Sequence, residues 1–149
     1  MKKIINFFRL FLPIIIGGIV GIIIKNYIDY SLIEKPPLSP PKLAFPIAWS
    51  ILYLLIGISY YIYRKNNYDK KNIQIYYIGL ILNALWSIIF FVLKLRLLSI
   101  IWIIALIIIT IILFINYKKQ NKTSAYLLIP YIIWLTYATY INIGVYILN

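Results

Sequence analysis

Five apolar runs dominate this chain, and each is long enough to cross a lipid bilayer as a helix. They cover approximately residues 4–24, 43–63, 73–93, 98–117 and 124–148. A spanning helix needs about 20 mostly apolar residues, whereas the strands of a membrane barrel alternate polar and apolar side chains. The sequence therefore predicts an all-α membrane protein, a bundle of five transmembrane helices that forms a single domain over residues 1–149.

The composition agrees with a membrane protein. Hydrophobic residues make up 64% of the chain, compared with roughly 45–50% in soluble domains. The net charge is +12, from 15 Lys and Arg against 3 Asp and Glu. These cations lie between the apolar runs and form no continuous stripe, so we expect them to contact lipid headgroups and set the topology. The predicted partner is the lipid bilayer, and no nucleic acid is expected.

The distribution of Lys and Arg predicts the orientation. The N-terminus and the segments after the second and fourth runs hold more of them than the segments on the other side. The richer side carries Lys2, Lys3, Arg64, Lys65, Lys70, Lys71, Lys118, Lys119 and Lys122. We therefore expect the N-terminus inside and the segment 25–42 outside a bacterial cell membrane, or a mitochondrial outer membrane if the source is eukaryotic. The first run is longer than the apolar region of a signal peptide, so we expect it to be a retained helix.

Several kinds of chemistry are excluded by residue content. The chain has no Cys and no His, which removes thiolate chemistry and His ligation of a metal or a haem iron. The three acids, Asp29, Glu34 and Asp69, all lie in connecting segments. An ion-driven pump normally needs ionisable groups inside its spans. We therefore predict no metal, no cofactor and no established catalytic residue.

Three of the runs carry aromatic and polar residues at helical spacing. The stripes are Trp49, Tyr53, Gly57 and Tyr60 in the second run, Asn83, Trp86, Ser87, Phe90 and Phe91 in the third, and Tyr131, Trp134, Ala138 and Asn142 in the fifth. Buried amides, indoles and phenols need hydrogen-bond partners in hydrocarbon, so these faces should point toward one another. The first and fourth runs are nearly all aliphatic and can face lipid. This pattern favours a cavity for a flat, mostly apolar ligand, although polar contacts between helices with no ligand would also explain it.

Two shorter patterns accompany the stripes. Pro36, Pro37, Pro40 and Pro41 stiffen the first connecting segment. Such a segment can cover the mouth of a bundle, or it can be only a rigid connector. The pair Gly17 and Gly21 has the spacing that allows close helix contact, although glycine pairs are also common in membrane helices with no such role.

These motifs resemble those of the TspO/MBR family, the translocator proteins or peripheral-type benzodiazepine receptors. The resemblance begins with Lys-Pro-Pro-Leu-Ser-Pro-Pro at 35–41 and Phe-Pro-Ile-Ala-Trp-Ser-Ile-Leu-Tyr at 45–53. It continues with Asn-Ala-Leu-Trp-Ser at 83–87 and with Leu-Ile-Pro-Tyr-Ile-Ile-Trp at 128–134. It covers essentially the whole chain.

The resemblance implies a five-helix bundle, often a homodimer, with a cavity closed by the first loop. It also implies binding of porphyrins such as protoporphyrin IX, of sterols and of benzodiazepine-type ligands. By position, Trp49 and Trp134 match the family's paired cavity tryptophans. The other implied lining residues are Pro41, Tyr53, Asn83, Trp86, Phe90 and Ala138.

The chain departs from the family pattern at two positions. The family often has an aromatic residue where this chain has Leu38, and no Lys or Arg follows Tyr140, which leaves the weak sterol-recognition pattern incomplete.

Three functional hypotheses follow from the sequence, and the first is a tetrapyrrole-binding receptor or sensor. The alternatives are a porphyrin transporter, or an enzyme that degrades porphyrin with light and oxygen and uses Trp49 and Trp134 as redox-active groups.

Overall fold

Residues 1–66 and 69–149 are described by a computed structural model, and its helices account for all five predicted spans. The elements are α1 (Lys2–Ile24), α2 (Ala44–Asn66), α3 (Lys70–Ser87), a π-helical turn η1 (Ile88–Val92), α4 (Arg96–Gln120), α5 (Lys122–Tyr126) and α6 (Ile129–Leu148). The described residues contain no strand. The prediction of an all-α bundle with five spans is confirmed.

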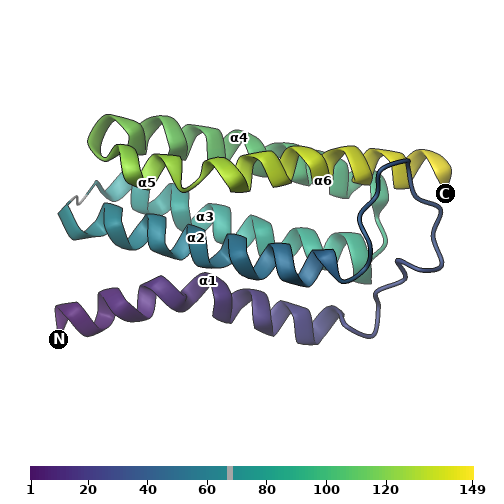
Figure 1. Ribbon diagram of the computed structural model, residues 1–149, viewed down its shortest axis with the longest axis horizontal. Coiled ribbons are helices and arrows are strands. Elements are labelled where there is room, and N and C mark those ends of the chain that lie inside the picture. The colour runs from purple at the N-terminus through teal and green to yellow at the C-terminus, as the bar shows by residue number, and fades with distance from the viewer. Residues whose placement is uncertain (67–68) are drawn as a thin grey trace.

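The helices run along the long axis of the molecule (Figure 1). α4 packs against α3 and α6, while α1 lies at the edge of the bundle and packs mainly on α2. The loop 25–43 and the C-terminus lie at one end, and the N-terminus lies at the other. We refer to these as the loop end and the N-terminal end.

The contact between α1 and α2 depends on two glycines. A Cβ atom at Gly57 would collide with the carbonyl oxygen of Leu10, so only glycine allows the helices to approach this closely. Farther along α1, Gly17 leaves room for the ring of Tyr53. Pro13 lies inside α1 and removes one backbone donor, which accounts for an irregular point in this helix. α1 therefore lies close to α2 at these two levels.

The third span does not end as the regular helix expected over 73–93. It continues from α3 into the π turn η1, which accommodates one more residue than an α-helical turn. The carbonyl of Phe90 accepts a hydrogen bond from Arg96 Nη1 at 2.7 Å, and the guanidinium lies over the Phe90 ring. The wider turn leaves Phe90 and Phe91 in edge contact, with both rings lining one small cavity.

The fifth span is also interrupted. α5 ends at Tyr126, and α6 begins only at Ile129, after two residues in a turn. Pro130 stands in the first turn of α6, where its missing N–H costs least. The single helix expected over 124–148 is therefore two helices that follow each other, because proline favours a helix start at this point.

The N-terminal end of the bundle is filled by aromatic side chains. Tyr60 stacks on Tyr76 with ring centroids 3.8 Å apart, and Tyr63 stacks on Tyr117 at 4.0 Å. Asn72 donates to the Tyr63 hydroxyl at 2.9 Å and binds this layer to α3. The four rings are almost fully buried, so this end of the bundle is a packed core.

Candidate ligand-binding cavity

A cavity of about 480 Å³ opens at the loop end, between α1, α2, the α3–η1 span and the loop 25–43. Its size falls within the range of pockets that hold small organic ligands, about 300–1,000 Å³. Most of its lining is apolar or aromatic. This hollow end contrasts with the packed core at the N-terminal end.

One wall of the cavity is aromatic. Trp49 stacks on Tyr53 with ring centroids 5.4 Å apart and an interplanar angle of 29°. Trp86 lies 6.4 Å from Trp49, and Phe45 and Phe91 extend the wall. Offset aromatic faces of this kind favour a flat, polarisable partner.

α1 also lines the cavity, with three glycines and the apolar side chains of Ile14, Val20 and Ile24. A Cβ atom built at Gly18 or Gly21 would have no atom within 4 Å. Gly17 is different because its missing side chain makes room for Tyr53. Close helix contact, predicted for the pair Gly17 and Gly21, thus occurs at Gly17 alone. Gly21 instead leaves backbone uncovered in the cavity lining.

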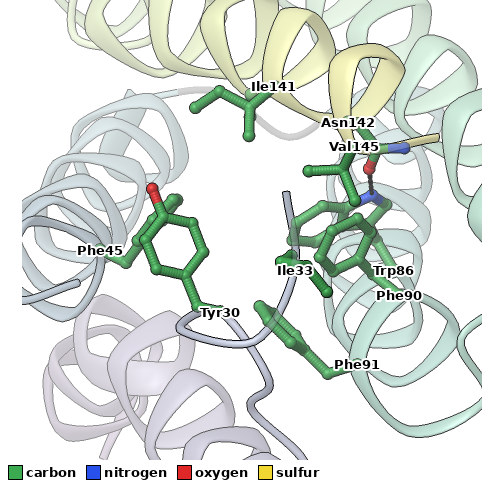
Figure 2. Close-up of a pocket in the computed structure, with 10 residues that line it drawn as sticks. Tyr30, Ile33, Phe45, Trp86, Phe90, Phe91, Ile141, Asn142 and Val145 are labelled. Atoms are coloured by element: carbon green, nitrogen blue, oxygen red, sulfur yellow. Dashed lines mark hydrogen bonds between the residues drawn. The ribbon is translucent and has the colours of Figure 1, made fainter. Parts of the chain in front are cut away.

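A second, much smaller cavity of about 20 Å³ lies beside the first, with room for about one water molecule. Figure 2 shows the side chains that surround it, from the loop, α2, the α3–η1 span and α6. Four aromatic residues line both cavities, namely Tyr30, Phe45, Trp86 and Phe91. These rings are the partition between the two spaces.

Hydrogen bonds hold the aromatic wall from behind. Asn83 accepts from the Tyr53 hydroxyl at 2.8 Å and donates to the Tyr131 hydroxyl at 2.6 Å. It is buried and thereby joins α2, α3 and α6 directly beneath the cavity. Trp86 Nε1 donates to Asn142 Oδ1 at 3.2 Å, which is drawn as the dashed line in Figure 2. These bonds fix the orientation of the rings, because each polar group has a buried partner.

The loop 25–43 is fastened to α6 by phenol groups. Tyr137 and Tyr140 donate to the backbone carbonyls of Leu38 and Pro37, and the ring of Pro36 fits against Gly144, where a Cβ atom would collide with it. Leu38 has a positive φ of 65° and its side chain is 86% exposed. The side chain at this departure from the family pattern therefore points away from the cavity.

Tyr30 secures the loop from within by donating to the carbonyl of Pro40. Burial, together with the neighbouring Tyr137, raises the pKa of the Tyr30 phenol above its ordinary value, and a hydrogen bond with Ser39 offsets part of this effect. A raised pKa keeps the phenol protonated, so it remains a donor throughout the physiological pH range. The Tyr30 hydrogen bond to the loop is therefore kept over this range.

An ion pair joins the first part of the loop to α4. Asp29 Oδ2 accepts from Arg96 Nη2 at 2.9 Å, and both side chains are 14% exposed. Lys94 approaches the same carboxylate oxygen at 3.5 Å but is half exposed. Since Arg96 also holds the Phe90 carbonyl, this pair connects the loop to the π turn.

The residues predicted for the site fall into four groups. Trp49, Tyr53 and Trp86 line the large cavity, while Phe90, Ala138 and again Trp86 line the small one. Asn83 supports the wall from behind. Pro41 and Trp134 line neither cavity.

Trp134 lies behind the wall. Its ring makes edge contact with Trp49 at 6.3 Å and with Phe45 at 6.0 Å. Its Nε1 is buried and has no hydrogen-bond partner among the residues described. It therefore reaches the cavity only through the rings of Trp49 and Phe45.

The wall formed by α1 was missed by the sequence analysis, which left this aliphatic helix free to face lipid. Ile14, Gly18, Gly21 and Ile24 all line the cavity. The signal available was the three glycines within five residues of one helix. Lys42 and Phe45, near the start of α2, were also not singled out.

The fold and the cavity together define a class, a multi-pass membrane protein whose helices enclose an aromatic binding cavity beneath a proline-rich loop. The model of the TspO/MBR family matches residues 9–148. The chain belongs to the TspO/MBR family. It is an integral membrane protein, and its five spans and prokaryotic relatives indicate the cell membrane.

The relatives extend over most of the chain. "Tryptophan-rich protein TspO" of Archaeoglobus fulgidus is 40% identical over 122 residues, which are 80% of this chain and 79% of the relative. "Protein CrtK" of Rhodobacter capsulatus is 30% identical over 142 residues, 89% of this chain and 86% of the relative. "Tryptophan-rich sensory protein" of Cereibacter sphaeroides is 26% identical over 129 residues, 87% and 82% respectively. The name of the Cereibacter sphaeroides relative describes a sensory protein.

Proposed function

We propose that this protein is a receptor for a flat, hydrophobic small molecule, and that the ligand is a tetrapyrrole of the protoporphyrin IX type. The observation that carries the proposal is the lining of the 480 Å³ cavity, which combines the rings of Trp49 and Tyr53 with open space at Gly18 and Gly21 of α1. Aromatic faces beside open, apolar space favour a planar ring system. Because the chain has no His or Cys, such a ring would be held by stacking and apolar contact.

A fluorescence titration with protoporphyrin IX tests the proposal. Ligand in the cavity should quench Trp49 and Trp86, which line it, more than Trp102, whose indole donates to the Leu82 carbonyl away from the cavity. Trp49→Phe should remove a large share of the quenching, and Trp102→Phe should remove little. Equal losses in the two variants would show that the porphyrin does not enter this cavity.

A cavity-filling substitution tests the shape directly. Gly21→Leu should place its side chain in the open space and weaken porphyrin binding by at least about 10-fold, equivalent to about 1.4 kcal/mol. Ile22→Phe is the matched control, because Ile22 is on the same turn and is 68% exposed on the outer side. Unchanged binding by Gly21→Leu would contradict the proposed location.

The packed core beneath the cavity favours a receptor over a transporter. Below Tyr53 and Trp86, the buried Asn83–Tyr131 bond and the stacked tyrosine pairs fill the bundle toward the N-terminal end. A ligand that enters at the loop end would meet this core. A flux assay in porphyrin-loaded vesicles tests the distinction, and porphyrin transport that depends on the protein would favour the alternative.

Light-dependent degradation of porphyrin is the second candidate. It is supported by the contacts of Trp49, which lines the cavity and lies 6.3–6.4 Å from Trp134 and Trp86. Illumination in the presence of oxygen should then convert bound porphyrin into a new absorbing product, and Trp49→Phe should slow the conversion. An unchanged porphyrin spectrum with the unaltered protein would exclude this activity.

The homodimer and sterol binding also remain proposals that rest on the family resemblance. Cross-linking of the purified protein in detergent tests the dimer. For sterols, the Tyr140 hydroxyl donates to the Pro37 carbonyl, and no cation follows it in the sequence. We expect sterol binding through this segment to be weak, which a competition titration with cholesterol would measure.

A further inference from the structure

Lys42 is the only charged side chain among the described residues that line the large cavity. It stands at the end of the proline-rich loop, in the turn that immediately precedes α2, and it is exposed. The ammonium group is therefore at the mouth of the cavity, while the aromatic wall lies deeper. A ligand lying between Trp49 and α1 would bring its outer edge to Lys42.

The Lys42 ammonium has no partner among the described residues, either as an ion pair or as a side-chain hydrogen bond. The neighbouring Lys35 differs, because its ammonium donates to the carbonyls of Tyr30 and Ile33 at 2.6 and 3.1 Å and lies over the Tyr30 ring. Of the two cations at this end of the loop, only Lys42 is available to a ligand.

The nearby acids do not neutralise Lys42. Asp29 is paired with Arg96 and Lys94, and neither Asp29 nor Glu34 lines the cavity. Three of the four lining hydroxyls already donate within the protein, from Tyr30 to Pro40, from Ser50 to Pro46 and from Tyr53 to Asn83. The fourth, Ser87, is a neutral donor and carries no charge. An anionic group on the ligand would therefore find its cationic partner at the mouth.

We propose that Lys42 is a specificity-determining residue that selects planar ligands bearing a carboxylate. The carboxylate pairs with the Lys42 ammonium at the mouth, and the uncharged ring system lies in the aromatic slot. This inference rests on the proposed function, since it assigns the charge and orientation of the ligand in the same cavity. An ion pair between an ammonium and a carboxylate gains more where water is partly excluded, as at the edge of a cavity.

The test compares protoporphyrin IX with its dimethyl ester, which has the same ring but no carboxylate. Affinities are measured by tryptophan quenching in neutral detergent for the unaltered protein, Lys42→Gln, Lys42→Arg and Lys35→Gln. Porphyrin fluorescence in micelles without protein corrects for partitioning. We expect the unaltered protein to bind the acid about 3- to 10-fold more tightly than the ester, as one partly exposed ion pair provides.

Lys42→Gln should bring this ratio to about 1 by weakening the acid alone, while Lys42→Arg and Lys35→Gln should keep it. Added salt should lower the ratio in the unaltered protein because the pair is accessible to ions. Equal binding of acid and ester by the unaltered protein would overturn the role of Lys42 and leave the receptor intact. The same loss in Lys35→Gln as in Lys42→Gln would overturn it as well. Failure of both ligands to quench would instead contradict the proposed function.

Discussion

Glycines on the same pair of helices have opposite roles at the scale of single residues. Gly57 is required because the Leu10 carbonyl oxygen occupies the space that a Cβ atom would take. A Cβ atom at Gly21 would have no heavy atom within 4 Å, and the missing side chain contributes open volume to the cavity. One serves helix packing, and the other serves the shape of the cavity.

A pair of alanine substitutions should separate these roles. Gly57→Ala should lower the free energy of unfolding by about 1–3 kcal/mol, because α1 must move away from α2. Gly21→Ala should leave stability unchanged or raise it by up to about 1 kcal/mol, because alanine is the better helix former. Thermal melting in detergent measures both. Equal effects of the two substitutions would show that α1 and α2 do not cross as closely as described.

The ion pair between Asp29 and Arg96 gives a second test at this scale. Arg96→Gln leaves a largely buried carboxylate without its guanidinium and should destabilise the protein by about 2–4 kcal/mol. Asp29→Asn in the Arg96→Gln background should recover part of this loss, because no uncompensated charge remains. A double-mutant cycle with melting temperatures measures the coupling. Strictly additive effects would mean that the two groups do not interact in the membrane-embedded protein.

At the scale of elements, the proline-rich loop is held in place by α6. Its contacts are backbone carbonyls facing Tyr137 and Tyr140, and a proline ring against Gly144. Prolines suit this role because their carbonyls remain free acceptors while their rings limit backbone motion.

Removing the hydroxyls of Tyr137 and Tyr140 should weaken the attachment of the proline-rich loop to α6. In Tyr137→Phe/Tyr140→Phe, trypsin should cleave the Lys42–Leu43 bond several-fold faster than in the unaltered protein, whereas the Lys35–Pro36 bond is protected by its proline. Tyr146→Phe is the matched control, since this exposed phenol of α6 makes no hydrogen bond with the described residues. An unchanged cleavage rate in the double variant would show that other contacts hold the proline-rich loop.

The helices also show how much of the fold could be predicted from the sequence. The five spans could be placed to within a few residues, because about 20 apolar residues in a row leave few alternatives to a spanning helix. The π turn at Ile88–Val92 could not, because no residue type favours it and its stabilising partner, Arg96, comes from the next helix. Pro130 indicated a helix start, but the two-residue turn between α5 and α6, which both pack against α4, could not be located from the sequence.

The whole molecule has its large cavity at the loop end and stacked, buried tyrosine rings at the N-terminal end. Ligand binding should therefore slow backbone amide hydrogen exchange at the loop end alone. Hydrogen exchange at saturating protoporphyrin IX should slow in residues 14–24 and 42–53, which contain most of the cavity lining, and remain unchanged in residues 113–126. Uniform protection along the chain would indicate general stabilisation and contradict binding at the loop end.

The location of the site follows from the helix stripes, but its shape follows from tertiary structure. Trp49, Tyr53 and Trp86 could be chosen from spacing because aromatic residues on facing helices converge. Trp134 occupies an equivalent stripe and yet lies behind Trp49. The rotation of α6 about its axis depends on hydrogen bonds from Asn83 and Trp86 of α3. The contribution of α1 depends on where it crosses α2, which glycine spacing alone does not specify.

The large cavity has a consequence for turnover in the cell. A ligand that binds there and not to the unfolded chain stabilises the folded protein by mass action. A ligand present at 100 times its dissociation constant adds about 2.7 kcal/mol to the folded state alone. Such a shift changes the unfolded fraction that proteases remove. The abundance of this protein should therefore rise with the supply of its ligand, a link between metabolite level and protein lifetime that a pulse-chase experiment in porphyrin-fed and porphyrin-starved cells would measure.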